Sequence, residues 1–149
     1  MRYEQTAAAA ASTAQAWTAL TEVTDWPNWT TTMTAVEPLD DARLRPGDRY
    51  KIRQPSLGVM VWRVTELRAG ESFVWETRSP GVRTVGFHRL AADPGGGTLI
   101  TIGLDQTGPL AGLVGLLLGR RIRAYLKREA AGLKAASEAA AGVNPSGAA

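Results

Sequence analysis

The chain contains no cysteine and a single histidine, His88, among its 149 residues. The absence of cysteine excludes disulfides, thiolate metal ligands and cysteine nucleophiles. Zinc and non-heme iron centres usually draw on several imidazoles, which one histidine does not supply. We therefore expect a protein that binds no metal and uses no cofactor.

Long apolar runs are also missing. The longest strongly apolar stretch, Leu110 to Leu118, has nine residues, two of them glycine, whereas a membrane-spanning helix needs about 20. The first residues, Met1 to Glu4, contain no apolar core of a signal peptide. We expect a cytoplasmic protein with no integral membrane segment, long enough for one domain with a substantial core.

The distribution of charge argues against two further classes. The formal net charge is +3, but the basic residues are spread along the chain and are not interleaved with exposed aromatic residues that would stack on bases. The carboxylates form no pair at a spacing typical of glycosidases. We predict a protein that binds no nucleic acid and hydrolyses no glycosidic bond.

Alternate residues between Tyr50 and Leu104 belong to two different faces. One face is apolar with a few uncharged polar groups, and the other is mostly arginine. This period of two is typical of antiparallel strands that are buried on one side. The many aromatic residues on the buried face indicate a cavity lining, and they also fit a solid core. The residues of the buried face are Tyr50, Ile52, Gln54, Met60, Trp62, Val64, Phe73, Trp75, Thr77, Gly86, His88, Leu90, Ile100, Ile102 and Leu104.

The segments before this region predict a strand, two short helices and a second strand. Ser12 and Gln15 have the spacing of a capping box, and Asp25 precedes a proline in the first turn of the next helix. The predicted elements are a strand from Arg2 to Ala9, a helix from about Thr13 to Val23, a short helix beginning at Asp25 and a strand from Thr30 to Leu39.

Turn sequences then separate five further strands, and the short spacing predicts an antiparallel meander. Gly108 and Pro109 open a long amphipathic helix, and the tail at 139–149 is predicted to be disordered after a single domain at 1–138. The expected apolar stripe of the helix comprises Leu110, Leu113, Val114, Leu117, Leu118, Ile122, Tyr125, Leu126 and Leu133.

Taken in order, these segments resemble the helix-grip fold of the START-like (SRPBCC) superfamily. The resemblance covers Tyr3 to Glu138 and is carried by several short segments: Ala16-Trp17, Asp25-Trp26-Pro27-Asn28-Trp29, Gly47-Asp48-Arg49-Tyr50, Trp62-Arg63-Val64-Thr65-Glu66, Phe73-Val74-Trp75, Gly97-Thr98-Leu99-Ile100-Thr101 and the helix from Gly108-Pro109 through Gly132-Leu133-Lys134 to Glu138. It implies an α+β fold in which a curved, seven-stranded antiparallel sheet wraps around a long C-terminal helix, with two short helices after the first strand. The superfamily includes lipid carriers, polyketide cyclases and dehydratases, and iron-dependent oxygenases. The oxygenase iron site implies two histidines, and this chain has one.

His88 is the candidate catalytic residue, because alternation directs it toward the expected cavity and an imidazole moves protons near neutral pH. The alternative is a partly buried histidine whose hydrogen-bond partner is a backbone carbonyl or a neighbouring tyrosine. Gly86 beside it would leave room for a ligand or permit a bend in the strand. The other candidate ligand-binding residues are the wall-forming Trp62, Phe73 and Trp75 and the hydrogen-bonding Tyr50, Gln54, Thr77 and Thr84. Trp17, Trp26 and Trp29 are expected to pack the helical pair against the end of the sheet.

Three functions remain open. The first is binding of a small hydrophobic or aromatic molecule in the cavity, and the second is a cofactor-independent cyclase or dehydratase in which His88 moves a proton. In the third, the tryptophans close the cavity and the domain acts through protein contacts. Whichever holds, we expect a monomer or homodimer. The identity of the ligand does not follow from the sequence.

Overall fold

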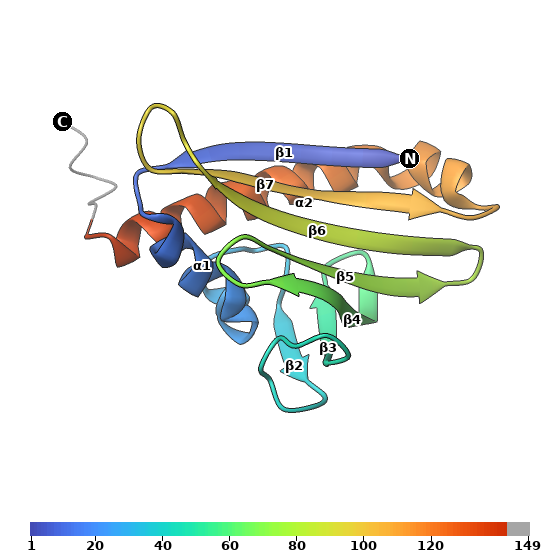
Figure 1. Ribbon diagram of the computed structural model, residues 1–149. Coiled ribbons are helices and arrows are strands. Elements are labelled where there is room, and N and C mark those ends of the chain that lie inside the picture. Colours follow the sequence, from blue (N-terminus) through green and yellow to red (C-terminus); the bar gives the residue numbers. More distant parts are fainter. Residues whose placement is uncertain (143–149) are drawn as a thin grey trace.

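The computed structural model describes residues 1–142 and has the predicted α+β architecture (Figure 1). Seven strands form one sheet and a long helix, α2, lies along it, so the predicted helix-grip fold is confirmed. The elements in chain order are β1 (Arg2–Ala9), α1 (Thr13–Thr21), the 3-10 helix η1 (Val23–Asn28), β2 (Ala35–Pro38), β3 (Arg49–Gln54), β4 (Gly58–Arg68), β5 (Ser72–Ser79), β6 (Val82–Ala92), β7 (Thr98–Thr107) and α2 (Ala111–Ala140).

The sheet is antiparallel throughout, in the order β1-β7-β6-β5-β4-β3-β2. Strands β2 to β7 follow one another as a meander, and β1 closes the other edge by pairing with β7. The strands change direction markedly from β1 to β2 (Figure 1). Because a turning sheet and a straight helix do not touch everywhere, space is left between them.

The capping box predicted at α1 is present. The Ser12 hydroxyl accepts the Gln15 N–H at 3.1 Å, and the Gln15 side chain accepts the Ser12 N–H at 2.9 Å. The helix ends at Thr21, two residues earlier than expected, and the chain continues as η1, which contains Trp26.

The strand expected from Thr30 to Leu39 is shorter than predicted, because only Ala35–Pro38 pairs with β3 as β2. Thr30 and Thr32 are buried, and their hydroxyls lie 3.0 Å apart. The Thr32 hydroxyl also donates to the carboxylate of Glu129 on α2. Side-chain hydrogen bonds of this kind compete with a strand ladder, so this segment is irregular.

The expected apolar stripe of α2 was wrong in its first turns, where Leu113 and Leu117 are exposed. There the helix turns its small residues, Gly115 and Gly119, toward β1, and a side chain at Gly115 would collide with the Met1 side chain and lie tightly against the Tyr3 hydroxyl. This close approach rotates the leucines outward. Farther along, the helix buries Ile122, Tyr125, Leu126, Glu129, Ala130, Leu133 and Ser137.

The end of α2 also bears on the predicted tail. The helix continues to Ala140, so the first two residues of that tail are helical. Ala141 and Gly142 form a turn, and the remainder of the predicted tail, at 143–149, lies outside the described residues. Among residues 1–142, no helix is both long and apolar enough to cross a membrane.

Candidate functional site

Two adjoining hollows lie between the buried face of the sheet and α2. The first, here called the tryptophan hollow, encloses about 50 Å³, and the second, the Gln106 hollow, encloses about 140 Å³. Five residues line both: Gln54, Leu57, Trp62, Leu104 and Ile122. The tryptophan hollow is completed by Trp26, Met33, Trp75, His88, Ile102, Gly103, Tyr125, Leu126 and Glu129, and the Gln106 hollow by Met60, Ser79, Val82, Thr84, Gln106, Val114 and Leu118.

Three indole rings form much of the wall of the tryptophan hollow. The ring centre of Trp75 lies 5.4 Å from that of Trp62 and 5.3 Å from that of Trp26. Gly86 pairs with Trp75 across the strands, and a side chain there would come within 2.7 Å of the Trp75 indole nitrogen. The room left by this glycine is therefore occupied by the Trp75 ring.

His88 is buried among these aromatic rings. Its imidazole stacks on Phe73 with centres 4.1 Å apart, and its Nδ1 lies 3.3 Å from the Phe73 carbonyl oxygen. Burial lowers the pKa of His88 to about 3, although the hydrogen bond to Phe73 opposes that shift. The ring is therefore neutral near neutral pH. Donation from Nδ1 leaves Nε2 as a hydrogen-bond acceptor.

Glu129 brings a buried carboxyl from α2 into the same hollow. It is 9% exposed, and its Oε1 accepts a 2.8 Å hydrogen bond from the Thr32 hydroxyl. Burial raises the pKa of Glu129 to about 7, and the bond from Thr32 partly offsets the rise. In the described part of the chain, no lysine or arginine lines either hollow. Among those residues the carboxyl therefore has no cationic partner at the site.

The predicted site residues divide into two groups. Gln54, Trp62, Trp75 and His88 line the tryptophan hollow, and Thr84 lines the Gln106 hollow. The other three lie outside the lining: Phe73 is stacked on His88, Thr77 is buried opposite Thr84, and Tyr50 is buried beside the loop before β3.

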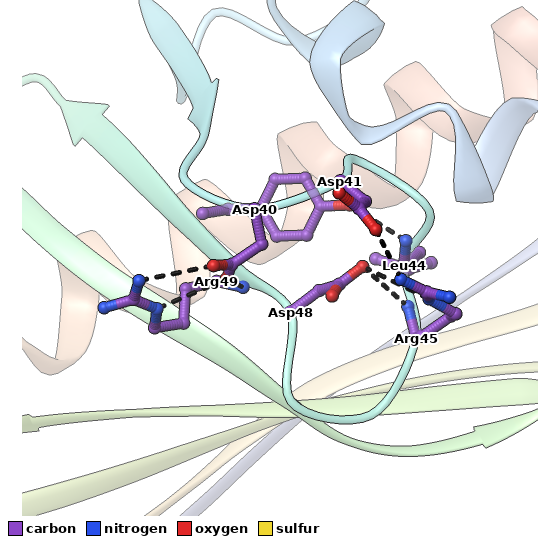
Figure 2. A network of polar contacts seen from close by, with 7 residues as sticks. Asp40, Asp41, Leu44, Arg45, Asp48 and Arg49 are labelled. Atoms are coloured by element: carbon purple, nitrogen blue, oxygen red, sulfur yellow. Dashed lines mark hydrogen bonds and ion pairs between the residues drawn. The ribbon is translucent and has the colours of Figure 1, made fainter.

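The surroundings of Tyr50 explain its place. Its hydroxyl accepts the N–H of Leu44 at 3.0 Å, within a loop that is held together by polar contacts (Figure 2). In that loop Asp40 pairs with Arg49, and Asp41 pairs with Arg45. The hydrogen bonds from Arg49 lower the pKa of Asp40 below its ordinary value. Tyr50 thus anchors a loop and does not reach the hollows.

Sequence reasoning missed four lining residues of interest: Trp26, Gln106, Tyr125 and Glu129. Gln106 continues the alternation of β7 by one step beyond Leu104, and Glu129 is an isolated acid within the buried stripe of α2. Among residues 1–142, the Gln106 Oε1 atom is buried without a hydrogen-bond partner, while its Nε2 donates to Thr84 at 3.4 Å. The Tyr125 hydroxyl donates to the Pro55 carbonyl and so ties α2 to the β3–β4 turn.

The strand arginines lie outside the hollows, as alternation predicted. Arg53 and Arg83 are exposed, and Arg83 pairs with Glu76 at 2.6 Å on the outer face. The register shift in the sheet lies between Val64 and Glu66 of β4, a strand that contains neither of these arginines. Within residues 1–142, no group of three or more histidine or acidic side chains is placed to hold a metal ion.

Comparison with known proteins places the chain in a family. The model of the family described as polyketide cyclase / dehydrase and lipid transport matches residues 1–138. The chain therefore belongs to this family, which confirms the START-like resemblance read from the sequence. Comparison with curated proteins gave no significant match.

Solved structures of low sequence identity share the fold. A START superfamily protein from Mycobacterium smegmatis aligns with a TM-score of 0.71 and 17% identity, covering 93% of this chain and 97% of its own. The protein TTHA0849 from Thermus thermophilus aligns with a TM-score of 0.76 and 13% identity, covering 94% of this chain and 99% of its own.

A two-domain protein shares the fold as well. The di-domain aromatase/cyclase StfQ from the steffimycin biosynthetic pathway aligns with a TM-score of 0.75 and 17% identity. The alignment covers 95% of this chain and 52% of StfQ, so this chain spans about half of that protein. At these identities the likeness shows the fold alone.

Proposed function

We propose that the protein binds a small hydrophobic or aromatic molecule in the hollows between the sheet and α2. The observation that carries the proposal is the unfilled space beside Trp26, Trp62 and Trp75 in the centre of the fold. Protein cores are normally packed without voids much larger than a water molecule. Flat apolar walls with a few polar groups are typical of small-molecule sites.

The size of the hollows limits the ligand. Sites for drug-sized molecules measure about 300–1,000 Å³, and the two hollows here enclose about 50 and 140 Å³. A single-ring molecule suits this space without rearrangement. A larger ligand requires Trp62 or Leu57, which line both hollows, to move aside.

The unpartnered Oε1 of Gln106 supports the proposal independently. A buried acceptor without a partner, as this oxygen is within residues 1–142, costs roughly 1–3 kcal/mol. The oxygen has almost no accessible surface, so a rotation of the Gln106 side chain toward the hollow would be needed for a ligand hydroxyl or N–H to satisfy it. The hollow thus offers a bound molecule both apolar contact and one orienting hydrogen bond.

Isothermal titration calorimetry with toluene, benzyl alcohol and para-cresol tests the proposal. We expect saturable binding of at least one compound by the wild-type protein. Leu104→Phe fills a position that lines both hollows and should weaken that binding by about 10-fold or more. Leu99→Phe is the matched control, because Leu99 lies on the same strand and is exposed. Equal binding by both variants, or no binding to the wild type, contradicts the proposal.

A cyclase-like or dehydratase-like reaction is the second candidate. It is favoured by Glu129, since a buried acid with a pKa of about 7 suits general acid–base catalysis near neutral pH, and His88 shares its hollow. The name of the family includes both activities and lipid transport. Mass spectrometry of ligands recovered after binding separates the candidates, because a carrier returns its ligand unchanged.

A further inference from the structure

The lining of the hollows carries hydrogen-bond acceptors as well as the donors of Gln54 and of the indole rings. His88 donates through Nδ1 to Phe73, which leaves Nε2 as an acceptor, and Gln106 leaves its Oε1 without a partner in the described part of the chain. The hydroxyl of Tyr125 already donates to Pro55. A ligand that matches these acceptors must itself bring donors.

The hydrogen bonds around Glu129 also favour its carboxylate form, which accepts hydrogen bonds from a ligand. Thr32 donates to Oε1 of Glu129 at 2.8 Å. The Thr30 hydroxyl accepts the Thr32 N–H at 3.2 Å, so it is free to donate to the Thr32 hydroxyl 3.0 Å away. Each proton in this chain of contacts is directed toward the carboxylate, which favours its ionised form.

The surroundings of Glu129 supply what a buried organic cation requires. The indole rings of Trp26, Trp62 and Trp75 line the same hollow, and the faces of such rings attract cations. Over residues 1–142, the lining contains no lysine or arginine to compete for the carboxylate. A buried ion pair is favourable only with good partners on both sides, and an ammonium group placed here has them.

We propose that the natural ligand is an organic amine, with its protonated nitrogen beside the Glu129 carboxylate and its apolar body in the Gln106 hollow. This inference rests on the proposed binding function and names the chemical class of the ligand. The tryptophan hollow is large enough for a substituted ammonium group, and the adjoining Gln106 hollow is large enough for a ring.

Binding of such a cation depends on pH through Glu129. The titratable groups that share its hollow are His88 of β6 and Tyr125 of α2. Thr32 is uncharged. Lys127 and Arg128, which precede Glu129 along α2, are exposed. Because burial raises the pKa of Glu129 to about 7, the carboxyl is mostly protonated at pH 6 and mostly ionised at pH 8. Amine affinity should therefore rise about 10-fold over this interval.

The test compares benzylamine, benzyl alcohol and benzoate by calorimetry at pH 6 and pH 8. We expect benzylamine at pH 8 to bind about 10-fold or more tightly than benzyl alcohol, and benzoate to bind weakest. Glu129→Gln retains an oxygen for the Thr32 hydroxyl but carries no charge, and it should abolish both the preference for the amine and its pH dependence. Glu66→Gln, on the exposed outer face of β4, is the matched control and should change neither.

Thr32→Val provides a test that does not depend on the folding of the Glu129 variant. It removes the donor that favours the ionised carboxyl, so the midpoint of the pH dependence should move upward. Benzyl alcohol binding as tightly as benzylamine overturns the amine inference and leaves the binding function intact. An amine preference that survives in Glu129→Gln overturns it as well. Failure of all three compounds to bind contradicts the binding function itself.

Discussion

His88 and Glu129 are two buried titratable groups that face one hollow, and burial favours the neutral form of each. The pKa of His88 falls to about 3, and that of Glu129 rises to about 7. Near neutral pH the histidine is an uncharged acceptor, while the carboxyl is close to the midpoint of its titration. Of the two, Glu129 is the group whose charge responds to small changes of pH or to a bound ligand.

These shifts have opposite effects on stability. The pKa of His88 is lower in the folded than in the unfolded protein, so its contribution is complete above pH 6.5 and is lost as the pH falls toward 3. The pKa of Glu129 is higher in the folded protein, so its contribution is complete below pH 4.5 and is lost as the pH rises through 7. Between pH 4.5 and pH 6.5, a rise in pH therefore increases the stability of the wild type through His88 and decreases it through Glu129.

Glu129→Gln removes the part of the pH dependence of stability that comes from Glu129. The free energy of unfolding of the variant minus that of the wild type should increase by about 3 kcal/mol from about pH 4 to about pH 8, because only the wild type loses the Glu129 contribution. Urea unfolding at several pH values measures the difference, in which all other carboxyls cancel. A difference that stays constant with pH would show that Glu129 titrates as an ordinary exposed acid.

At the scale of elements, alternation predicted the strands well and periodicity predicted the long helix less well. Trp62, Trp75 and His88 were assigned to the buried face because a strand has only two faces. A helix has a continuum of directions, and the leucines at its start suggested a stripe through Leu113 and Leu117. In the structure, the face that the start of α2 turns toward the sheet is the one with small residues, which permit a close approach to β1. That contact depends on tertiary packing, so the helix sequence alone does not predict it.

The same reasoning explains which site residues were missed. Tyr125 was correctly predicted in the buried stripe of α2 but was given no role in the site, and the charged Glu129, four residues farther on, was left out of that stripe. Trp26 was assigned a packing role, and it does donate from its indole nitrogen to the Leu20 carbonyl at 3.0 Å while lining the hollow. The link between Thr32 and Glu129 spans 97 positions, so local patterns contain no signal for it.

Two leucines of α2 provide a matched stability test of this packing direction. Leu133 is 1% exposed, and Leu133→Ala should cost about 2–5 kcal/mol through lost burial and the cavity left behind. Leu117 is 71% exposed, and Leu117→Ala should change stability by no more than about 0.5 kcal/mol. Chemical denaturation of both variants measures the costs. Similar costs for the two would contradict the orientation of α2 described here.

At the scale of the molecule, the sheet and η1 supply the aromatic wall, and the long helix supplies the carboxyl of Glu129. The strand order and the single helix cover were predictable from the order of the elements and their turns. The hollow volumes were not, because they depend on how individual tryptophan rings pack around Gly86 and against α2. The fold and the family leave both ligand binding and catalysis open. The first question is therefore whether a small molecule occupies the hollows.

The most direct measurement is a two-dimensional NMR titration with benzyl alcohol that follows the indole N–H signals of the five tryptophans. Trp26, Trp62 and Trp75 line the tryptophan hollow, whereas Trp17 and Trp29 lie outside the lining of both hollows. A ligand between the sheet and α2 should shift the first three signals in a saturable way and leave the Trp17 signal unchanged. Shifts confined to Trp17 and Trp29, or no shifts at all, would contradict the account.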